Sequence, residues 1–242
     1  CPVSSRPACC SARRPAAFRR VVAQVRGSHQ TGWKMQTVAS IDGTRIAFWR
    51  SGKGPALLLV HGATSDHNTW RFVLPALEEH FTVYAMDRRG RGGSGDHQAF
   101  SLQREAEDVA AVVGTIDGPT CVFGHSYGAM CALEAALTTS IEKLILYEGV
   151  PLQGAEGYPP GIVERLDGKL LAGDVEGVVL DVLRELVEMP ASEIELLRGQ
   201  RDLWAARLAN ARTIPRELRV ERDYAFDSQR FRTLRTSTLF LV

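Results

Sequence analysis

The 242-residue sequence has no apolar run that approaches the ~20 residues a membrane-spanning helix requires. Residues 1–34 contain no Asp or Glu but seven Arg and Lys residues, and the rest of the chain carries 22 basic against 28 acidic side chains. This mildly acidic body gives no sign of a nucleic-acid surface. With 45% hydrophobic and 24% charged residues, the composition is typical of a globular protein. We therefore expect a cytoplasmic domain without a nucleic-acid partner or a membrane span; its oligomeric state is left open.

Cysteine is scarce outside residues 1–34, which hold three of the five cysteines. Cys121 and Cys131 have no metal-ligand spacing, so we interpret them as small core residues in a reducing compartment. The basic leader, residues 1–34, resembles a transit peptide in composition, but it lacks the apolar stretch of a secretory signal. It also lacks a clear amphipathic period, so we favour translated upstream sequence ahead of a start at Met35.

A serine between two glycines is the most informative motif. Ser126 lies in the stretch Gly-His-Ser-Tyr-Gly, with Gly124 and His125 before it and Gly128 two residues after it. An apolar run precedes this stretch and a helix-forming run follows it, as expected for a nucleophile elbow, a sharp turn between strand and helix. The turn crowds the two flanking positions, which explains the glycines. The motif predicts Ser126 as a catalytic nucleophile.

Histidine is missing where such a serine needs one. In this kind of triad the order along the chain is Ser, acid, His, but the last histidine of this sequence is His125. The chain ends at Val242 inside an apolar run. We expect the polypeptide to be incomplete, with little or no turnover by these 242 residues.

The rest of the pattern predicts an α/β fold. Asp42-Gly43 separates two strands of a hairpin, and apolar strands near residues 55–60, 81–86, 121–123 and 143–147 alternate with helices near residues 69–80 and from Ser101 to 113. This alternation indicates a mostly parallel sheet covered by helices on both faces, with an antiparallel hairpin at one edge. We expect a core over residues 35–148, a helical cap over 149–233 and the next core strand from 234 to 242.

Three motifs in this order resemble the α/β-hydrolase superfamily. His61-Gly62 follows one strand, the loop from Asp87 to Ser94 follows the next, and the elbow follows the third. The resemblance covers residues 36–242, and the helical block after Glu148 is similar to bacterial members with a cap between the sixth and seventh strands. It implies that the catalytic acid and histidine would follow residue 242.

The resemblance also implies two main-chain donors for the oxyanion, the N–H groups of Ala63 and Tyr127. Glu148 is an alternative acid, because it follows the sixth strand. Asp87 is a further candidate, although we expect it to hold its own loop together through hydrogen bonds and arginine pairing. Arg88, Arg89 and Arg91 could bind a phosphate, but without a phosphate-binding glycine loop we expect a solvated loop instead.

Upstream histidines are weak substitutes for the missing base. The side chain of His125 should point away from Ser126, and His61 is expected to brace the oxyanion loop. His67 and His97 lie on loops and could approach the serine, although we favour loop-bracing or solvated roles. Trp70 should pack its helix, or alternatively line the pocket.

We therefore expect a hydrolase that needs no cofactor and no metal and acts on a small-molecule ester or related acyl substrate through Ser126. Esterase, lactonase, perhydrolase-like and C–C hydrolase activities stay open, because the cap sets substrate choice. A serine at the elbow argues against epoxide-hydrolase and dehalogenase mechanisms. The alternative is a non-catalytic binding protein of the same fold, or an inactive fragment.

Overall fold

The computed structural model describes residues 33–149 and 158–241. The chain divides into residues 1–31 and residues 32–242, and only the second unit is described here. The prediction for the basic leader lies outside the described residues, except that Lys34 is the first residue of strand β1 and so belongs to the sheet. Residues 150–157 of the expected cap are also outside them.

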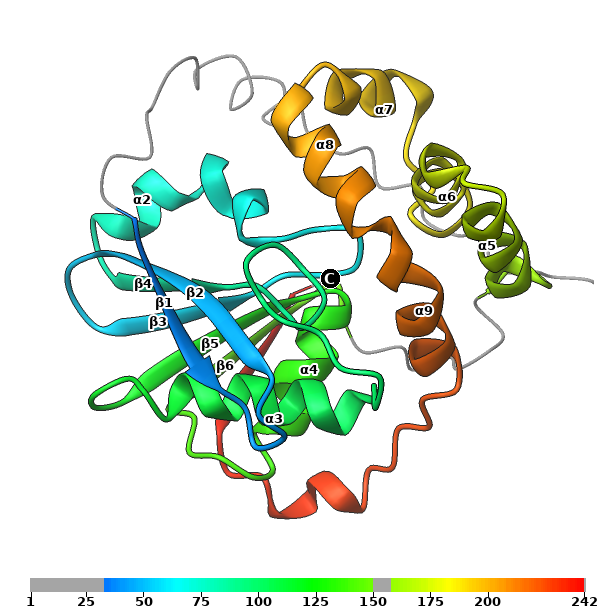
Figure 1. Ribbon diagram of the computed structural model, residues 1–242. Coiled ribbons are helices and arrows are strands. Elements are labelled where there is room, and N and C mark those ends of the chain that lie inside the picture. The colour runs from blue at the N-terminus through cyan, green and yellow to red at the C-terminus, as the bar shows by residue number, and fades with distance from the viewer. Residues whose placement is uncertain (1–32, 150–157, 242) are drawn as a thin grey trace, which may run out of the picture. The chain divides into compact units, whose positions relative to one another are not determined.

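A seven-stranded mixed sheet forms the core of residues 32–242 (Figure 1). The strand order is β1-β2-β4-β3-β5-β6-β7; β1 and β2 are antiparallel to their neighbours, and β4, β3, β5, β6 and β7 run parallel. This confirms the expected fold class. The strands are β1 (Lys34–Ala39), β2 (Arg45–Gly52), β3 (Ala56–Val60), β4 (Thr82–Met86), β5 (Thr120–His125), β6 (Lys143–Tyr147) and β7 (Ser237–Leu241).

Helices cover both faces of the sheet. On one face, α3 (Leu102–Val113) and α4 (Tyr127–Ala135) pack on alternate strand residues such as Leu58, Val122 and Leu144. On the other face, Trp70 and neighbouring apolar residues of η1 (His67–Phe72) and α2 (Leu74–Glu78) pack on the opposite set of strand residues. The central strands β3 and β4 are buried along their whole length, as their continuous apolar sequences predict.

Local sequence signals account for most element boundaries. The Ser101 hydroxyl accepts a hydrogen bond from the N–H of Arg104 and caps α3, as predicted. The turn between β1 and β2 uses Gly43 at a φ of +81°. The single helix expected over residues 69–80 is wrong in detail: a 3₁₀ helix, η1, is followed by the short α2, with Pro75 in its first turn.

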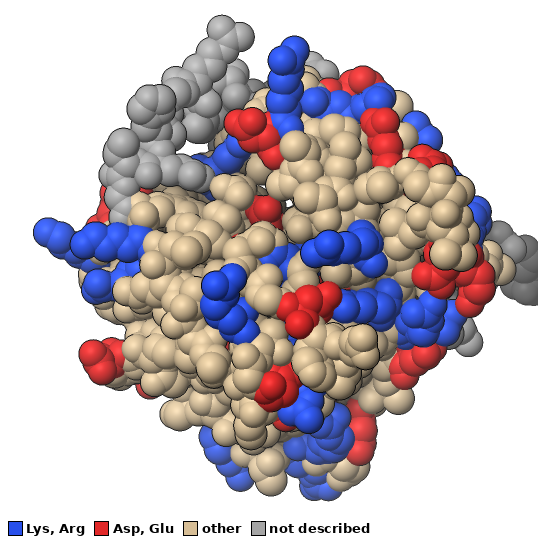
Figure 2. Space-filling model, in the orientation of Figure 1, with Lys and Arg blue, Asp and Glu red and all other residues tan. Residues whose placement is uncertain are grey.

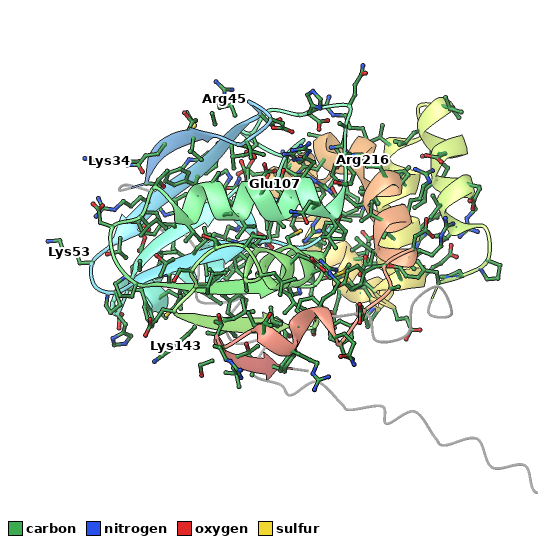
Figure 3. The ribbon with its side chains drawn as sticks, turned by 90° about the horizontal axis from the view of Figure 1, so that it is seen from below. Lys34, Arg45, Lys53, Glu107, Lys143 and Arg216 are labelled. Carbon is green, nitrogen blue, oxygen red and sulfur yellow. The ribbon has the colours of Figure 1, made fainter. Side chains whose placement is uncertain are left out.

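The described helices between β6 and β7 bury a core of their own around Leu166, Val178 and Trp204. They lie where the sequence predicts a cap, and the word cap is used for them as a name only. The contacts of the cap join it to the sheet in one compact unit. At one of these contacts, Arg216 pairs with Asp96 at 2.7 Å (Figure 3). The cap helices are α5 (Ile162–Leu171), α6 (Val175–Asp181), η3 (Val182–Leu186), α7 (Ala191–Arg198), α8 (Arg201–Asn210), η4 (Ala211–Thr213) and α9 (Ile214–Arg222).

Strand β7 follows a short 3₁₀ helix, η5 (Arg230–Thr233), and pairs with β6 at the outer side of the sheet. Leu239 and Phe240 are 53% and 60% exposed there. On the face shown in Figure 2, basic and acidic side chains are interspersed, without a large area of one sign. None of the helices in the described ranges is long and apolar enough to cross a membrane.

Candidate active site

Ser126 lies at the turn between β5 and α4, at the carboxyl edge of the parallel strands. Its backbone has a φ of +52° and a ψ of −127°, a conformation that is rare and strained for a residue with a side chain. The residue is held there because its N–H donates to Tyr147 O and its own carbonyl accepts from Ala129 N, both at 2.8 Å. Strain that the surrounding structure sustains is typical of functional sites.

The two glycines of the motif are required by close backbone approach. A Cβ on Gly124 would lie 2.5 Å from Ala129 Cα, and a Cβ on Gly128 would lie 2.4 Å from the carbonyl oxygens of Val60 and His61. Neither neighbour is a flexible side chain that could move away. The spacing of the glycines is therefore explained by the packing of α4 against β5 and β3.

The turn after β3 approaches the serine from the other side. A Cβ on Gly62 would lie 3.0 Å from Ser126 Cβ, so the two residues are in close contact. Among residues 33–149 and 158–241, no atom accepts a hydrogen bond from the backbone N–H of Ala63 or of Tyr127, which is the first residue of α4. Within these residues the two N–H groups are therefore not used by the fold, and their role as oxyanion donors stays a prediction.

His61 braces this turn, as expected from the sequence. Its Nε2 accepts a hydrogen bond from the Arg88 N–H at 3.2 Å, so Nδ1 carries the proton and donates to Gly62 O at 2.9 Å. Burial, together with the nearby charge of Arg88, holds the pKa of His61 well below its usual value. The ring is therefore neutral near pH 7 and acts as a structural bridge.

The arginines of the loop after β4 are buried, so the expectation of a solvated loop is wrong. Arg88, Arg89 and Arg91 have 1% or less of their surface exposed. Arg89 pairs with Asp108 at 2.6 Å and with Asp42 at 2.9 Å. The three guanidinium groups form ion pairs with carboxylates inside the fold. A phosphate-binding site at these arginines is therefore not supported.

Arg88 connects three parts of the site. It donates to the carbonyls of His61 (3.0 Å) and Gly62 (3.2 Å), and its guanidinium lies 4.6 Å from the centre of the Tyr127 ring. Two buried carboxylates balance its charge, Glu105 of α3 at 2.6 Å and Glu217 of α9 at 2.7 Å. Sequence reasoning missed Glu217, because nothing in its local pattern distinguishes it from a surface residue of an amphipathic helix.

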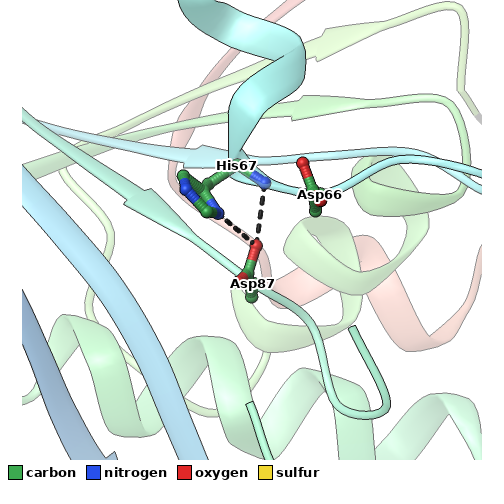
Figure 4. Close-up of side chains that lie close together, drawn as sticks. All are labelled: Asp66, His67 and Asp87. Atoms are coloured by element: carbon green, nitrogen blue, oxygen red, sulfur yellow. Dashed lines mark hydrogen bonds and ion pairs between the residues drawn. The ribbon is translucent and has the colours of Figure 1, made fainter. Parts of the chain in front are cut away.

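Asp87 holds its loop together through hydrogen bonds, as predicted, but not through an arginine. Its Oδ1 accepts from the His67 backbone N–H at 2.8 Å and bonds to His67 Nδ1 at 2.9 Å (Figure 4). Its Oδ2 accepts from Gly93 N at 2.7 Å. The His67 ring stacks on Trp49, with 3.5 Å between ring centres. Both residues are therefore engaged in structural contacts.

Asp66, His67 and Asp87 bring potential metal-ligand atoms within 4.8 Å of one another (Figure 4). The lone pairs of Asp87 are used by N–H groups, and Asp66 Oδ1 accepts from Asn68 N at 2.9 Å as the cap of η1. A divalent ion would have to displace these bonds. The cluster fits a hydrogen-bonded loop anchor better than a metal centre.

Of the remaining candidates, His125, Glu148 and Trp70 lie beside the elbow, whereas His97 lies on an exposed loop. His125 contacts Glu148, with Nε2 3.4 Å from Oε2, and its ring stacks on Tyr147. Burial lowers the pKa of His125, and the contact with Glu148 opposes this shift. Trp70 meets Phe123 and His125 edge-to-face, which places it beside the elbow strand as well as in its own helix. His97 is exposed, and its Nδ1 accepts from Ala99 N.

Comparison with known proteins gives a consistent result. A family model described as alpha/beta hydrolase family matches residues 57–241. The chain is 35% identical over 127 residues to N-formylmaleamate deformylase from Pseudomonas putida (50% of this chain, 47% of that protein). It is 32% identical over 127 residues to a soluble epoxide hydrolase from a Corynebacterium species (50% and 44%). The chain thus spans about half the length of the curated relatives it matches.

A solved structure agrees over a longer stretch. The crystal structure of an alpha/beta hydrolase from Sphaerobacter thermophilus is 36% identical, has a TM-score of 0.73, and covers 85% of this chain and 80% of its own. The parallel sheet with an antiparallel hairpin, the strained serine at the turn between β5 and α4 and the family match all agree. The chain belongs to the alpha/beta hydrolase family.

Proposed function

We propose that this protein is a serine hydrolase that acts, without a cofactor, on a small ester or related acyl substrate, with Ser126 as nucleophile. The observation that carries the proposal is the strained backbone of Ser126 at the start of α4. Such a turn presents the serine side chain at the edge of the sheet where ligands bind in open α/β structures. The relatives are hydrolases, but their named activities differ, so the likeness does not supply a substrate.

In the proposed reaction, Ser126 Oγ attacks the acyl carbon and passes its proton to a base. The N–H groups of Ala63 and Tyr127 stabilise the negative oxygen of the tetrahedral intermediate, a contribution of about 3–4 kcal/mol for each donor. The leaving group then departs with the proton, and water, activated by the same base, hydrolyses the acyl-enzyme. An aspartate at the elbow, which epoxide-hydrolase chemistry uses, is absent, because position 126 is serine.

The base is the missing element of this scheme. In the described part of the chain, no histidine forms a hydrogen bond with the Ser126 hydroxyl, and His61 and His67 are bonded to other groups. We propose that the histidine, and an acid to orient it, come from residues outside these 242. Glu148 is the alternative acid, since it lies beside the elbow and contacts His125.

A fluorophosphonate probe tests the proposal, because it reacts with activated serines. We expect the protein from its natural source to be labelled at Ser126 and to hydrolyse para-nitrophenyl butyrate. The Ser126→Ala variant should lose both properties, and the variant of the exposed Ser140, Ser140→Ala, should keep them. The 242-residue chain by itself should react much more slowly than the natural protein.

The second candidate is a non-catalytic binding protein, and it is favoured because no histidine of residues 33–149 or 158–241 is bonded to Ser126. A natural protein that neither reacts with the probe nor hydrolyses esters would support this candidate. Equal hydrolysis by the parent and by Ser126→Ala would exclude a role for Ser126 altogether.

A further inference from the structure

Arg207 of helix α8 reaches from the cap to the turn that follows the proposed oxyanion donor Ala63. Its Nη1 donates to Thr64 O at 3.1 Å and to Thr64 Oγ1 at 2.5 Å. Thr64 has a φ of +59°, a strained conformation for a β-branched residue, so the contact holds the turn in an unusual shape. A cap residue is thus attached directly to the turn beside the nucleophile.

The charge of Arg207 is not balanced by an ion pair. The loop arginines Arg88, Arg89 and Arg91 each form an ion pair with a buried carboxylate, whereas within residues 33–149 and 158–241 Arg207 forms none. Burial lowers the pKa of Arg207 to about 10, and the nearby charge of Asp66 only partly offsets this. The group remains protonated near pH 7. The side chain is only half-buried, so the part of the guanidinium that does not contact Thr64 still meets water. An anion that replaced this water would meet a positive charge that no carboxylate of the described residues pairs with.

The position of this charge relates it to the proposed nucleophile. Thr64 lies one residue after Ala63 and two after Gly62, which contacts Ser126. The charge of Arg207 also contributes to the lowered pKa of His125, the residue before the nucleophile. The charge of Arg207 therefore acts on a residue of the elbow, the His125 ring.

A recess surrounds the side chain. It is shallow and open to solvent, with an enclosed volume of about 10 Å³, roughly the room for one water molecule, and it lies between η1, the turn of residues 64–66 and helix α8. Thr64, Thr69 and Asn210 supply polar groups to its wall, and Leu203 and Ala206 supply apolar ones. No residue of the described ranges accepts a hydrogen bond from Nε or Nη2 of Arg207. Two donors of a planar fork are thus left for a ligand in a recess of mixed polarity.

We propose that Arg207 is the substrate-anion site of this protein: its guanidinium binds a carboxylate carried by the acyl substrate, such as a half-ester of a small dicarboxylic acid. The proposal rests on the proposed function of Ser126 and adds the class of substrate to it. Arginine suits this role because its fork donates two parallel hydrogen bonds to a carboxylate. Asp66, also in the wall of the recess, repels an anion, so the attraction has to come from the two free donors of Arg207.

Glutarate, a small dicarboxylate that cannot be hydrolysed, tests the site by isothermal titration calorimetry. We expect it to bind the parent chain, and to bind Arg207→Gln at least roughly tenfold more weakly because the bidentate pair is lost. Arg207→Lys should be intermediate, since it keeps the charge but not the fork. The matched control Arg212→Gln, at an exposed arginine of the next turn, should bind like the parent. The neutral analogue glutaramide should not bind.

Ala206→Glu covers the case in which Arg207→Gln does not fold, because it keeps the contact with Thr64 and adds a carboxylate to the recess wall. We expect this variant also to lose glutarate binding while it retains the melting temperature of the parent. Unchanged glutarate affinity in Arg207→Gln or Ala206→Glu would overturn the proposal, and so would a parent that shows no binding at millimolar glutarate.

A pair of substrates separates this proposal from the proposed function. In the natural protein, Arg207→Gln should raise KM for the para-nitrophenyl half-ester of glutaric acid, with little effect on KM for the matching neutral amide ester. A purely structural role would affect both substrates equally, and that result would overturn the anion site. If Ser126→Ala hydrolyses both substrates like the parent, the proposed function fails, whereas glutarate binding still decides the role of Arg207.

Discussion

Gly128 determines how closely helix α4 approaches the sheet. In the Gly128→Ala variant the new methyl group would lie 2.4 Å from two backbone oxygens, so the helix has to move. We expect the free energy of unfolding to fall by about 1–3 kcal/mol, as for other overpacked sites. Urea denaturation checks this value.

The control for Gly128 is Gly168 of the cap helix α5, where an added Cβ meets no atom within 4 Å. Gly168→Ala should stabilise the protein by about 0.5–1 kcal/mol, because alanine loses less backbone entropy in a helix. Similar effects of the two variants would contradict the tight packing inferred at the elbow.

His61 makes stability depend on pH in a defined direction. Its pKa is held well below the usual 6.5 by burial, with a contribution from the charge of Arg88. Below pH 6.5 the unfolded chain therefore binds a proton that the folded protein does not. Stability is fully present above this pH and is lost as the pH falls, by up to about 1.4 kcal/mol per pH unit.

The measurement is the free energy of unfolding between pH 7 and pH 5, in the parent and in His61→Asn. We expect the variant to show a shallower dependence in this window, although His125, whose pKa is also lowered, keeps a slope of the same sign. His97→Asn, at an exposed position, should follow the parent. Parallel curves for the parent and for His61→Asn would show that His61 is not the group that titrates.

Among the elements, helix α9 contributes a buried carboxylate that pairs with the loop after β4. Glu217 is fully buried and bonds to both Arg88 and Arg91. Glu217→Gln would leave two buried guanidinium groups with less negative charge, and we expect a loss of about 3–5 kcal/mol. Because Arg88 also holds the carbonyls of His61 and Gly62, hydrogen exchange should increase in the turn after β3 as well as in α9.

An exposed ion pair of the same cap provides the control. Asp167 and Arg219 are paired at 2.7 Å, with more than 40% of each side chain exposed. Asp167→Asn should change stability by only about 0–1 kcal/mol, since surface pairs are screened by water. A Glu217→Gln variant as stable as Asp167→Asn would contradict the role given to the buried network.

At the scale of the whole molecule, the apolar edge strand is expected to govern self-association of the 242-residue chain. In β7, the exposed side chains of Leu239 and Phe240 lie on a strand whose one partner among the described strands is β6. Unpaired apolar strands favour edge-to-edge association, and a lysine in such a strand opposes it. Leu239→Lys should therefore lower the aggregate content measured by light scattering. Leu171→Lys, at a 90% exposed residue away from the sheet, should not.

Much of the fold could be predicted because its signals are local. The Asp42-Gly43 turn, the Ser101 cap and the apolar strands each report on a few neighbouring residues, and the structure confirms the hairpin, α3 and the parallel strands. The prediction for residues 69–80 is less accurate. A 3₁₀ helix and the short α2 together have the pattern of one helix, so the sequence does not show where the first ends.

The sheet, the elbow and the position of the candidate nucleophile could be read from the amino-acid sequence, because strand periodicity and glycine spacing depend on local geometry. The burial of the arginines after β4 became visible only in the folded chain, as did the bonds from Glu217 to Arg88 and from Arg207 to Thr64. These partners are more than 100 residues apart in the chain. A charged residue has the same local pattern whether it faces water or a distant counter-charge. The packing of the cap on the sheet determines which of these occurs.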